Sequence, residues 1–285
     1  MNRKLLDLSG MIDDQTVELL RAVDQVASQQ AVPFLLVGAF ARELVLTHGY
    51  GINTHRATVD VDLGVEVSSW AQYEELRRGL LELGSFRENR QIQRLRFRNS
   101  LPVDLIPFGE IAQSDHTIFW PPEYAIRLDV TGFEDALRCC HIVRISNDPC
   151  LEICVTSLVG LAILKLSAWN DREVGRDRDA IDLLIILRNY LDAGNSERLW
   201  DEHPDIADQD DFDYELAGAR LLGRDISAVA STRTARILMN VLTKQTGARS
   251  TSALILGMQK ARPARSFEDV SRLLRSLLQG LHDRQ

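Results

Sequence analysis

Residues 58–65 read Thr-Val-Asp-Val-Asp-Leu-Gly-Val, and this stretch decides how the first half of the chain is interpreted. Apolar and polar residues alternate along it with a period of two, which is typical of a β-strand with one covered face. On this pattern Val59 and Leu63 share the apolar face with the other valines, whereas Asp60 and Asp62 share the opposite face. The stretch therefore predicts a strand that carries two carboxylates side by side.

The paired carboxylates of Asp60 and Asp62 need an explanation, because like charges two residues apart on one strand lie within about 7 Å of each other. A shared divalent cation removes the repulsion, and Mg²⁺ prefers hard oxygen ligands and retains waters and positions for phosphate groups. The alternative is that both side chains belong to the solvent face of a half-covered strand. The alternation by itself is compatible with both interpretations.

Further strands are predicted on either side of this stretch. Residues 34–37 form a short apolar run that ends at Gly38, and residues 39–46 then have helical composition. A glycine between a strand and a helix lets backbone amides meet an anionic group. In residues 101–108 the side chains of Leu101, Val103 and Leu105 share one face and Asp104 points to the other, which makes Asp104 a candidate third ligand or a base for an attacking hydroxyl.

The chain divides into two parts by its pattern of elements. Up to about residue 150 strands alternate with helices, which predicts an α+β fold, a mixed β-sheet with flanking helices. From residue 156 onward helical patterns dominate, so we expect two domains, residues 1–155 and residues 156–285. Further expected elements are helices at 14–29, 70–83, 181–191, 213–223, 229–243 and 267–282, a strand at 92–98, and loops at 48–54 and 192–213.

The charge balance limits how the protein can meet phosphate groups. The chain has 33 Lys and Arg residues against 41 Asp and Glu residues, a formal net charge of −8. This excludes a general nucleic-acid coat, so phosphates must be met by a local cluster or a metal ion. Arg94, Arg96 and Arg98 fall on one face of the expected strand at 92–98 and are candidates to contact the phosphates of a nucleotide or of RNA. The alternative is a solvated edge strand protected by charge.

No stretch predicts a membrane span, and the cysteines predict no metal motif. The longest near-apolar run, residues 155–164, is much shorter than the roughly 20 residues that a membrane helix needs. Acidic residues interrupt the N-terminal stretch before a signal-peptide core can form, so a cytoplasmic location is expected. The cysteines between Cys139 and Cys154 match no common zinc spacing, so buried reduced thiols are expected, with a metal site involving His141 as the alternative.

The helix expected after residue 156 carries a cation in an apolar segment. Lys165 lies on one helical stripe with Trp169 and Arg172. A buried lysine is costly without a counter-charge, so Lys165 needs an anion. The candidates are a carboxylate of the same domain, such as Asp177 or Asp182, and a nucleotide phosphate.

The order of these features resembles the nucleotidyltransferase superfamily related to DNA polymerase beta, which has a glycine turn, an Asp-x-Asp strand and a third carboxylate. Three stretches narrow the resemblance: LVGAFARELVL at 36–46, RATVDVDLGVEV at 56–67 and LAILKLSAWNDREVGRDRDAIDLLIIL at 161–187. Together they are similar to the AbiEii nucleotidyltransferase toxins, which are described as components of type IV toxin–antitoxin systems. The similarity covers about residues 34–190, and the residues that follow match only in being helical.

The resemblance implies a nucleotidyltransferase domain and a helical domain that completes the active-site groove. It implies transfer of a nucleoside monophosphate from a nucleoside triphosphate to a hydroxyl, with two Mg²⁺ ions held by Asp60, Asp62 and Asp104. Ala39 departs from the superfamily, which has Gly or Ser there, so a hydroxyl contact to phosphate is lost and backbone amides remain. The implied nucleotide-binding residues are Gly38, Ala39, Thr58, Lys165, Arg172, Arg176 and Asp177.

The sequence leaves the acceptor open. In the toxin group the acceptor is often RNA, notably the ends of tRNA, and the group also implies an antitoxin partner. A protein hydroxyl and a small molecule of the aminoglycoside kind remain alternatives. A different class also remains, a nucleotide-binding or interaction module that has kept the carboxylates without turnover.

Overall fold

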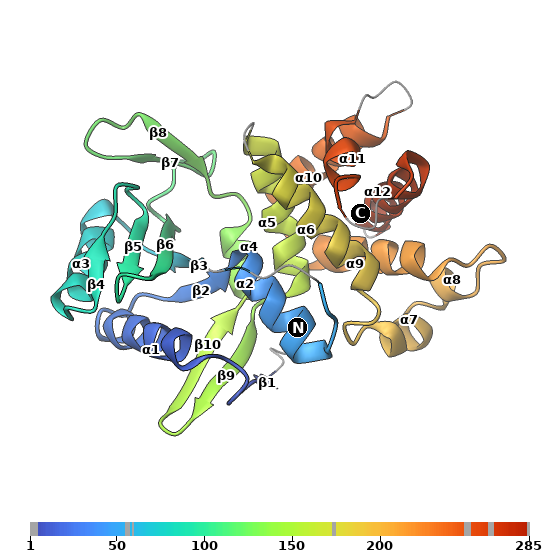
Figure 1. Cartoon of the computed structure of the whole chain (residues 1–285). Helices are drawn as coiled ribbons and strands as arrows, with labels where there is room; N and C mark the ends of the chain where they lie inside the picture. The colour runs from blue at the N-terminus through green and yellow to red at the C-terminus, as the bar shows by residue number, and fades with distance from the viewer. Residues whose placement is uncertain are drawn as a thin grey trace. The chain divides into compact units, whose positions relative to one another are not determined.

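The computed structural model describes residues 5–54, 58, 60–172, 175–247, 252–261 and 265–283 (Figure 1). Val59, which the alternation assigns to the apolar face, lies outside the described residues. The chain separates into two compact units, Met1–Ser157 (unit 1) and Leu158–Gln285 (unit 2). Every described strand belongs to unit 1, and the described elements of unit 2 are helices.

A mixed sheet forms the frame of unit 1, with the strand order β1-β9-β10-β2-β3-β6-β5-β4. β3 (Val61–Glu66) runs antiparallel to β2 (Phe34–Val37) and parallel to β6 (Leu101–Phe108). The three strands predicted around the aspartates are therefore neighbours, and the predicted α+β fold is confirmed. The other strands are β1 (Leu5–Asp7), β4 (Phe86–Glu88), β5 (Arg94–Phe97), β9 (His141–Asn147) and β10 (Cys150–Val155), and β7 (Thr117–Trp120) pairs with β8 (Ile126–Asp129) in a second sheet.

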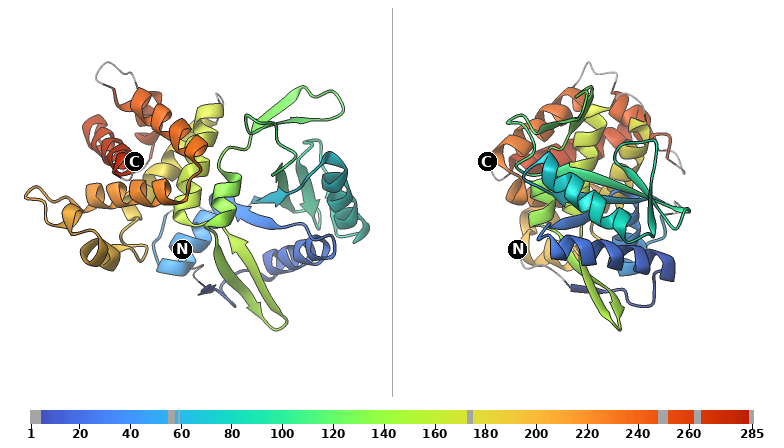
Figure 2. Two further views of the ribbon diagram at one scale, coloured as in Figure 1. Left: turned by 180° about the vertical axis from the view of Figure 1, so that it is seen from behind. Right: turned by 90° about the vertical axis from the view of Figure 1, so that its left-hand side faces the viewer.

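One face of the sheet is covered by α1 (Asp14–Gln29) and α3 (Trp70–Glu82), which lie side by side (Figures 1 and 2). Tyr73 of α3 donates a hydrogen bond over 3.1 Å to the carbonyl of Leu105 on β6, and Leu63 of β3 is fully buried. Both helices begin after a residue whose side chain caps the first turn, and their starts are those predicted from the sequence.

The opposite face of β3 carries Asp62. Two residues later, at Gly64, this face is covered by Phe133, the first residue of α4 (Phe133–Arg138). The ring of Phe133 lies 5.4 Å from the ring of Phe108, which is fully buried at the end of β6. Aromatic packing therefore fills this face at the end of the strands away from Asp62.

The helix predicted at 39–46 has different bounds. It begins at Gly38 as α2 (Gly38–Glu43) and continues as the π-helical segment η1 (Leu44–Gly49). Leu44, Val45 and Leu46 are buried, and this apolar packing keeps the chain helical past the predicted end. The prediction of a loop from residue 48 is therefore wrong at its start.

The β-prone stretch LRCCHIVRIS at 137–146 is a strand from His141 onward but not at the paired cysteines. α4 ends at Arg138, and β9 begins at His141, so Cys139 and Cys140 lie in the connection between them. The thiol of Cys139 lies 3.4 Å from the hydroxyl oxygen of Ser157, and burial raises the pKa of this thiol. Cys139 is therefore a protonated, packed thiol at neutral pH.

Helices predicted near 213–223, 229–243 and 267–282 are present in unit 2 as α9, α10 and α12. The backbones of α9 and α12 lie so close together that neither contact point has room for a side chain. A Cβ on Gly280 would lie 1.9 Å from the carbonyl oxygen of Arg220, and a Cβ on Gly223 would lie 2.3 Å from the carbonyl oxygen of Leu277. Only glycine permits this approach of the two backbones. The longer helices are α5 (Leu158–Asp171), α6 (Arg176–Asn189), α9 (Tyr214–Val229), α10 (Thr232–Thr246) and α12 (Phe267–His282), with the shorter α11 (Ala253–Met258).

The loop predicted at 192–213 contains two short helices, α7 (Ser196–Glu202) and α8 (Pro204–Ala207). Leu199 and Ile206 are buried, and these apolar anchors outweigh the acidic composition that suggested a solvated loop. The loop prediction was therefore wrong for half of this segment.

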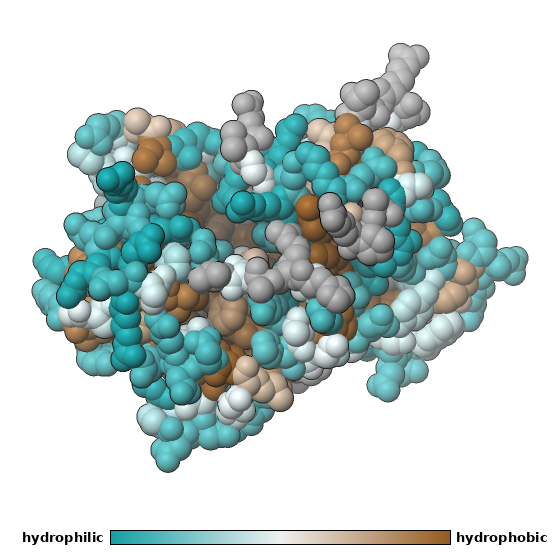
Figure 3. Space-filling view, viewed as in Figure 1, coloured by the Kyte–Doolittle hydropathy of each residue, from teal (hydrophilic) through white to brown (hydrophobic). Residues whose placement is uncertain are grey.

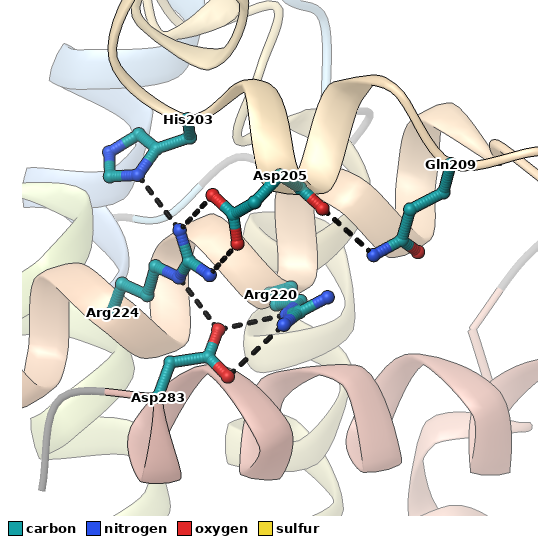
Figure 4. Close-up of polar contacts among 6 residues, drawn as sticks. All are labelled: His203, Asp205, Gln209, Arg220, Arg224 and Asp283. Carbon is teal, nitrogen blue, oxygen red and sulfur yellow. Dashed lines mark hydrogen bonds and ion pairs between the residues drawn. The ribbon is translucent and has the colours of Figure 1, made fainter.

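A network of ion pairs joins α8, α9 and the residue that follows α12 (Figure 4). The guanidinium of Arg224 donates to Asp205 over 2.9 Å, to Asp283 over 2.6 Å and to Nδ1 of His203 over 3.0 Å. Arg220 donates two further hydrogen bonds to Asp283, over 2.8 and 3.1 Å. The network holds the last helical turn of unit 2 against α9.

None of the helices formed by the described residues is both long and apolar enough to cross a membrane. The face shown in Figure 3 is mostly hydrophilic, with apolar colour in scattered patches.

Candidate active site

The three aspartates singled out by the sequence come from neighbouring strands of unit 1. Asp62 on β3 lies in register with Asp104 on the parallel strand β6 and with Val37 on the antiparallel strand β2. Asp60 directly precedes β3. The side chain of Asp104 is 12% exposed and that of Asp60 is 43% exposed. The sheet therefore brings the predicted carboxylates to one place, with one of them largely withdrawn from water.

Arg94 connects two of these carboxylates. It lies in register with Asp104 on the adjacent strand β5, where its Nε and Nη2 donate to the two oxygens of Asp104 over 2.6 and 2.8 Å. The same Nη2 donates to Oδ2 of Asp60 over 3.0 Å. The hydrogen bonds to Asp104 are the main cause that raises the pKa of Arg94, against the opposing effect of burial. Arg94 is thus a permanent cation between Asp60 and Asp104.

The prediction that Arg94, Arg96 and Arg98 share one strand face is confirmed for Arg94 and Arg96, which lie two residues apart on β5, and is wrong for Arg98. β5 ends at Phe97, and Arg98 has a backbone φ of +47°, outside the strand. Its guanidinium pairs with Glu18 at 2.5 Å. Arg96 is exposed on β5, so its contact with RNA stays a prediction, whereas Arg94 is occupied by carboxylates.

Gly38 lies against the carboxylate of Asp62. Its backbone φ is +75°, and a Cβ built on it would come within 2.1 Å of Oδ2 of Asp62. Glycine is therefore required here twice, for its backbone conformation and for the space that the carboxylate takes. α2 begins at this residue and includes Ala39, and the predicted contact of both residues with phosphate stays a prediction.

Thr58 lines a small cavity of unit 1. The cavity has a volume of about 260 Å³, and its lining includes Phe40, Glu43 and His48 on the helical segment that follows Gly38. Oε2 of Glu43 is buried and has no hydrogen-bond partner among the described residues. The sequence did not single out Glu43, because one glutamate in a helix carries no pattern.

The residues present suit a divalent cation by the chemistry of their donors. The carboxylates of Asp60, Asp62 and Asp104 are hard oxygen ligands. Asp62 and Asp104 lie on neighbouring strands, Asp60 directly precedes β3, and the bare Cα of Gly38 leaves room for the carboxylate of Asp62. Among the described residues, however, no group of three or more His, Cys, Asp or Glu side chains is arranged to hold one ion. The guanidinium of Arg94 stands between two of the carboxylates instead.

Lys165 forms ion pairs with two carboxylates of unit 2. Its ammonium donates to Asp179 over 3.0 Å and lies 2.8 Å from Oδ2 of Asp182, and all three side chains are largely buried. Burial lowers the pKa of Lys165, but the charges of Asp182 and Asp179 more than reverse this, so the net pKa is raised. The carboxylate partner anticipated at Asp182 is present. Asp179 was missed, although its spacing of three residues from Asp182 on one helix was a usable signal.

The other predicted nucleotide-binding residues of unit 2 lie around this group. The guanidinium of Arg172 is 53% exposed and lies 3.8 Å from Asp179. Arg176 lies over the ring of Trp169, with 5.5 Å to its centroid. Asp177 pairs with Lys260 at the surface and does not join the Lys165 group. The role of these residues toward a triphosphate stays a prediction.

A mixed sheet with carboxylates on neighbouring strands next to a glycine turn is the arrangement of a nucleotidyltransferase. The chain matches the family described as "Nucleotidyl transferase AbiEii toxin, Type IV TA system" over residues 19–270. Because the match spans most of the chain, the protein belongs to this family and is a nucleotidyltransferase. No curated protein sequence matches the chain.

Solved structures resemble the chain only distantly. ANT(2″)-Ia in complex with adenylyl-2″-tobramycin is 10% identical, with a TM-score of 0.38, over 65% of this chain and 92% of that one. A nucleotidyltransferase-like protein from Paracoccidioides brasiliensis is 15% identical, with a TM-score of 0.39, over 68% and 90%. The Thermotoga maritima CCA-adding enzyme complexed with tRNA is 12% identical, with a TM-score of 0.28, over 97% and 83%. With scores this low, the assignment rests on the family match.

Proposed function

We propose that the protein is a Mg²⁺-dependent toxin that transfers a nucleoside monophosphate from a nucleoside triphosphate to a hydroxyl of RNA, with tRNA as the preferred acceptor. The observation that carries the proposal is that Asp62, beside Gly38, lies in register with Asp104 on the neighbouring strand, and that Arg94 joins Asp104 to Asp60 just before β3. Carboxylates gathered in this way serve a reaction in which negative charge accumulates on phosphate oxygens.

Each carboxylate has a role in this proposal. Asp60 and Asp62 hold the metal ions, and Asp104 completes the site and takes the proton of the attacking hydroxyl. When bound, divalent ions neutralise the phosphate oxygens and make the attacking hydroxyl more acidic. The hydroxyl oxygen forms a bond to the α-phosphorus, the bond to the β-phosphate bridging oxygen breaks, and pyrophosphate leaves.

Two considerations support RNA as the acceptor. The family consists of nucleotidyltransferase toxins of type IV systems, whose action implies a cellular acceptor and an antitoxin. Arg96 is exposed on β5, one strand away from Asp104, where a polynucleotide phosphate can meet a guanidinium without disturbing the ion pairs of Arg94.

The experiment is a labelling survey with the full chain. Purified protein is incubated with Mg²⁺, each labelled nucleoside triphosphate in turn, and total cellular RNA. Label in the tRNA fraction supports the proposal. Label on protein alone would show a protein acceptor in place of RNA. Absence of label with every nucleotide, while nucleotide binding persists, would contradict RNA as the acceptor and leave either a binding module or a small-molecule acceptor that the reaction mixture lacks.

A matched pair of variants controls the survey. Asp60→Asn removes one charge from the candidate site, and Asp210→Asn removes one charge from an exposed position in unit 2. The proposal requires that the first variant loses transfer and that the second retains it.

A further inference from the structure

We infer that Arg94 is a positioning residue that occupies the place of a cation between Asp60 and Asp104, and that it must release Asp60 before a divalent ion can bind there. The inference rests on the proposed function, because it concerns metal loading of that same site. Arg94 thereby sets the metal affinity of the enzyme and makes loading an exchange of one cation for another.

The two contacts of Arg94 differ in strength. Toward Asp104 it uses Nε and Nη2 on both carboxylate oxygens, at 2.6 and 2.8 Å, and the Asp104 side chain is 12% exposed. Toward Asp60 it uses one bond of 3.0 Å, and the Asp60 side chain is 43% exposed. A bidentate bond to a buried carboxylate outlasts a single bond to a hydrated one. The Asp60 contact is therefore the one that opens.

Charge explains why the contact exists at all. Asp60, Asp62 and Asp104 gather three carboxylates in a small region, and without a metal their repulsion needs a compensating cation. Arg94 supplies it from the adjacent strand, in register with Asp104. A divalent cation bound by Asp60 would neutralise this carboxylate in place of Arg94. It would also repel the guanidinium, so the single hydrogen bond between Arg94 and Asp60 would be lost.

The consequence is a defined state of the loaded site. Arg94 stays on Asp104, so that the buried carboxylate is never left without a counter-charge, and each Asp104 oxygen keeps a further acceptor position for the metal ion or the attacking hydroxyl. Once the contact with Asp60 is lost, one N–H group of Arg94 Nη2 is available to donate a hydrogen bond to a phosphate oxygen. Arg94 therefore has separate effects on metal affinity and on turnover, which a purely structural ion pair does not have.

The test measures Mn²⁺ binding to the full-length protein by calorimetry and by electron paramagnetic resonance. In Arg94→Gln we expect Mn²⁺ affinity to rise about tenfold, which corresponds to about 1.4 kcal/mol, the scale of one charge-assisted hydrogen bond. Arg96→Gln removes the same charge two residues away on the same strand and should leave the affinity within about twofold.

A conservative variant separates charge from hydrogen bonding and keeps the test valid if Arg94→Gln does not fold. Arg94→Lys retains the positive charge beside Asp104, but a single ammonium cannot make the fork to both carboxylates. We expect it to keep the wild-type circular dichroism spectrum and to bind Mn²⁺ about threefold tighter, within the energy of one such bond. Affinity of both variants at or below the wild-type value overturns the inference.

A further variant distinguishes this inference from the proposed function. Adding Asp60→Asn to Arg94→Lys should abolish the gain in Mn²⁺ affinity, because the released ligand is then missing. If Asp60→Asn weakens Mn²⁺ binding in the wild type but Arg94→Lys does not strengthen it, the metal site stands and the exchange is wrong. If Asp60→Asn has no effect in either background, the proposed metal site fails and the inference fails with it.

Discussion

The carboxylate of Asp62 takes the space that the side chain of residue 38 would need. A Cβ on Gly38 would lie 2.1 Å from Oδ2 of Asp62, and the backbone of Gly38 has a φ of +75°. The glycine turn and the aspartate strand are thus one unit, because the turn allows the carboxylate its position. This contact links two parts of the sequence that lie 24 residues apart.

A substitution at Gly38 tests this relationship. Gly38→Ala should destabilise the protein by more than about 2 kcal/mol, because it adds a clash to the roughly 1–2 kcal/mol cost of a left-handed backbone. Gly84→Ala is the matched control, since Gly84 has the same φ of +75° with nothing within 4 Å of an added Cβ. Urea unfolding measures both. Equal losses of stability in the two variants would show that Asp62 does not occupy this space.

The Lys165 group predicts a second stability effect. Lys165→Met leaves Asp179 and Asp182 as buried carboxylates without their cation, so we expect a loss of about 3–5 kcal/mol in the free energy of unfolding. Lys260→Met is the control, because the Lys260 side chain is 61% exposed and pairs with Asp177 at the surface, where a pair contributes about 0–1 kcal/mol. Denaturant titration should separate the two variants clearly. Similar values would mean that Lys165 is not the counter-charge of this group.

The ion-pair network of Figure 4 predicts a loss of stability in acid. The hydrogen bond from Arg224 is the main cause that lowers the pKa of Asp205. Burial alone would raise the pKa of Asp283, but hydrogen bonds from Arg220 and Arg224 leave it lowered. A carboxylate with a lowered folded-state pKa stabilises the fold above its unfolded pKa, which is about 3.9, and this stability disappears as the pH falls through the lowered value.

The network should therefore make its full contribution to the free energy of unfolding at pH 5–7 and a progressively smaller one below about pH 4. Thermal unfolding as a function of pH measures this, with Arg224→Met as the comparison. The variant should have a lower melting temperature at pH 6 and a smaller further drop between pH 4 and pH 2. A parallel decrease in both proteins would assign the acid sensitivity to other groups.

Much of unit 1 could be predicted because its elements carry local signals. The strand at 34–37 and the helix at 14–29 match β2 and α1, since an apolar run or a capped amphipathic pattern defines each of them locally. The strand at 101–108 matches β6, and its alternation predicted that Asp104 lies on the face opposite Val103 and Leu105. The candidate carboxylates could be chosen for the same reason.

The misses have a common physical cause, which is contact between residues distant in sequence. Nothing local indicates that Arg94 pairs with Asp60 and Asp104, so the arginine was assigned to a phosphate-binding face. The short helices in 192–213 depend on the burial of Leu199 and Ile206 within unit 2, which composition does not report. Tertiary packing decided these features against the local pattern.

The most direct test of the central claim is the rate of nucleotidyl transfer in isosteric variants of the three aspartates. Asp60→Asn, Asp62→Asn and Asp104→Asn are compared with Asp210→Asn, using the nucleotide and acceptor that the labelling survey identifies. We expect each of the three to lose at least about 10²-fold in transfer rate, because groups that stabilise transition-state charge contribute on this scale, and we expect the control to retain the wild-type rate. Transfer at the wild-type rate in correctly folded Asp60→Asn and Asp62→Asn variants would contradict the assignment of the active site.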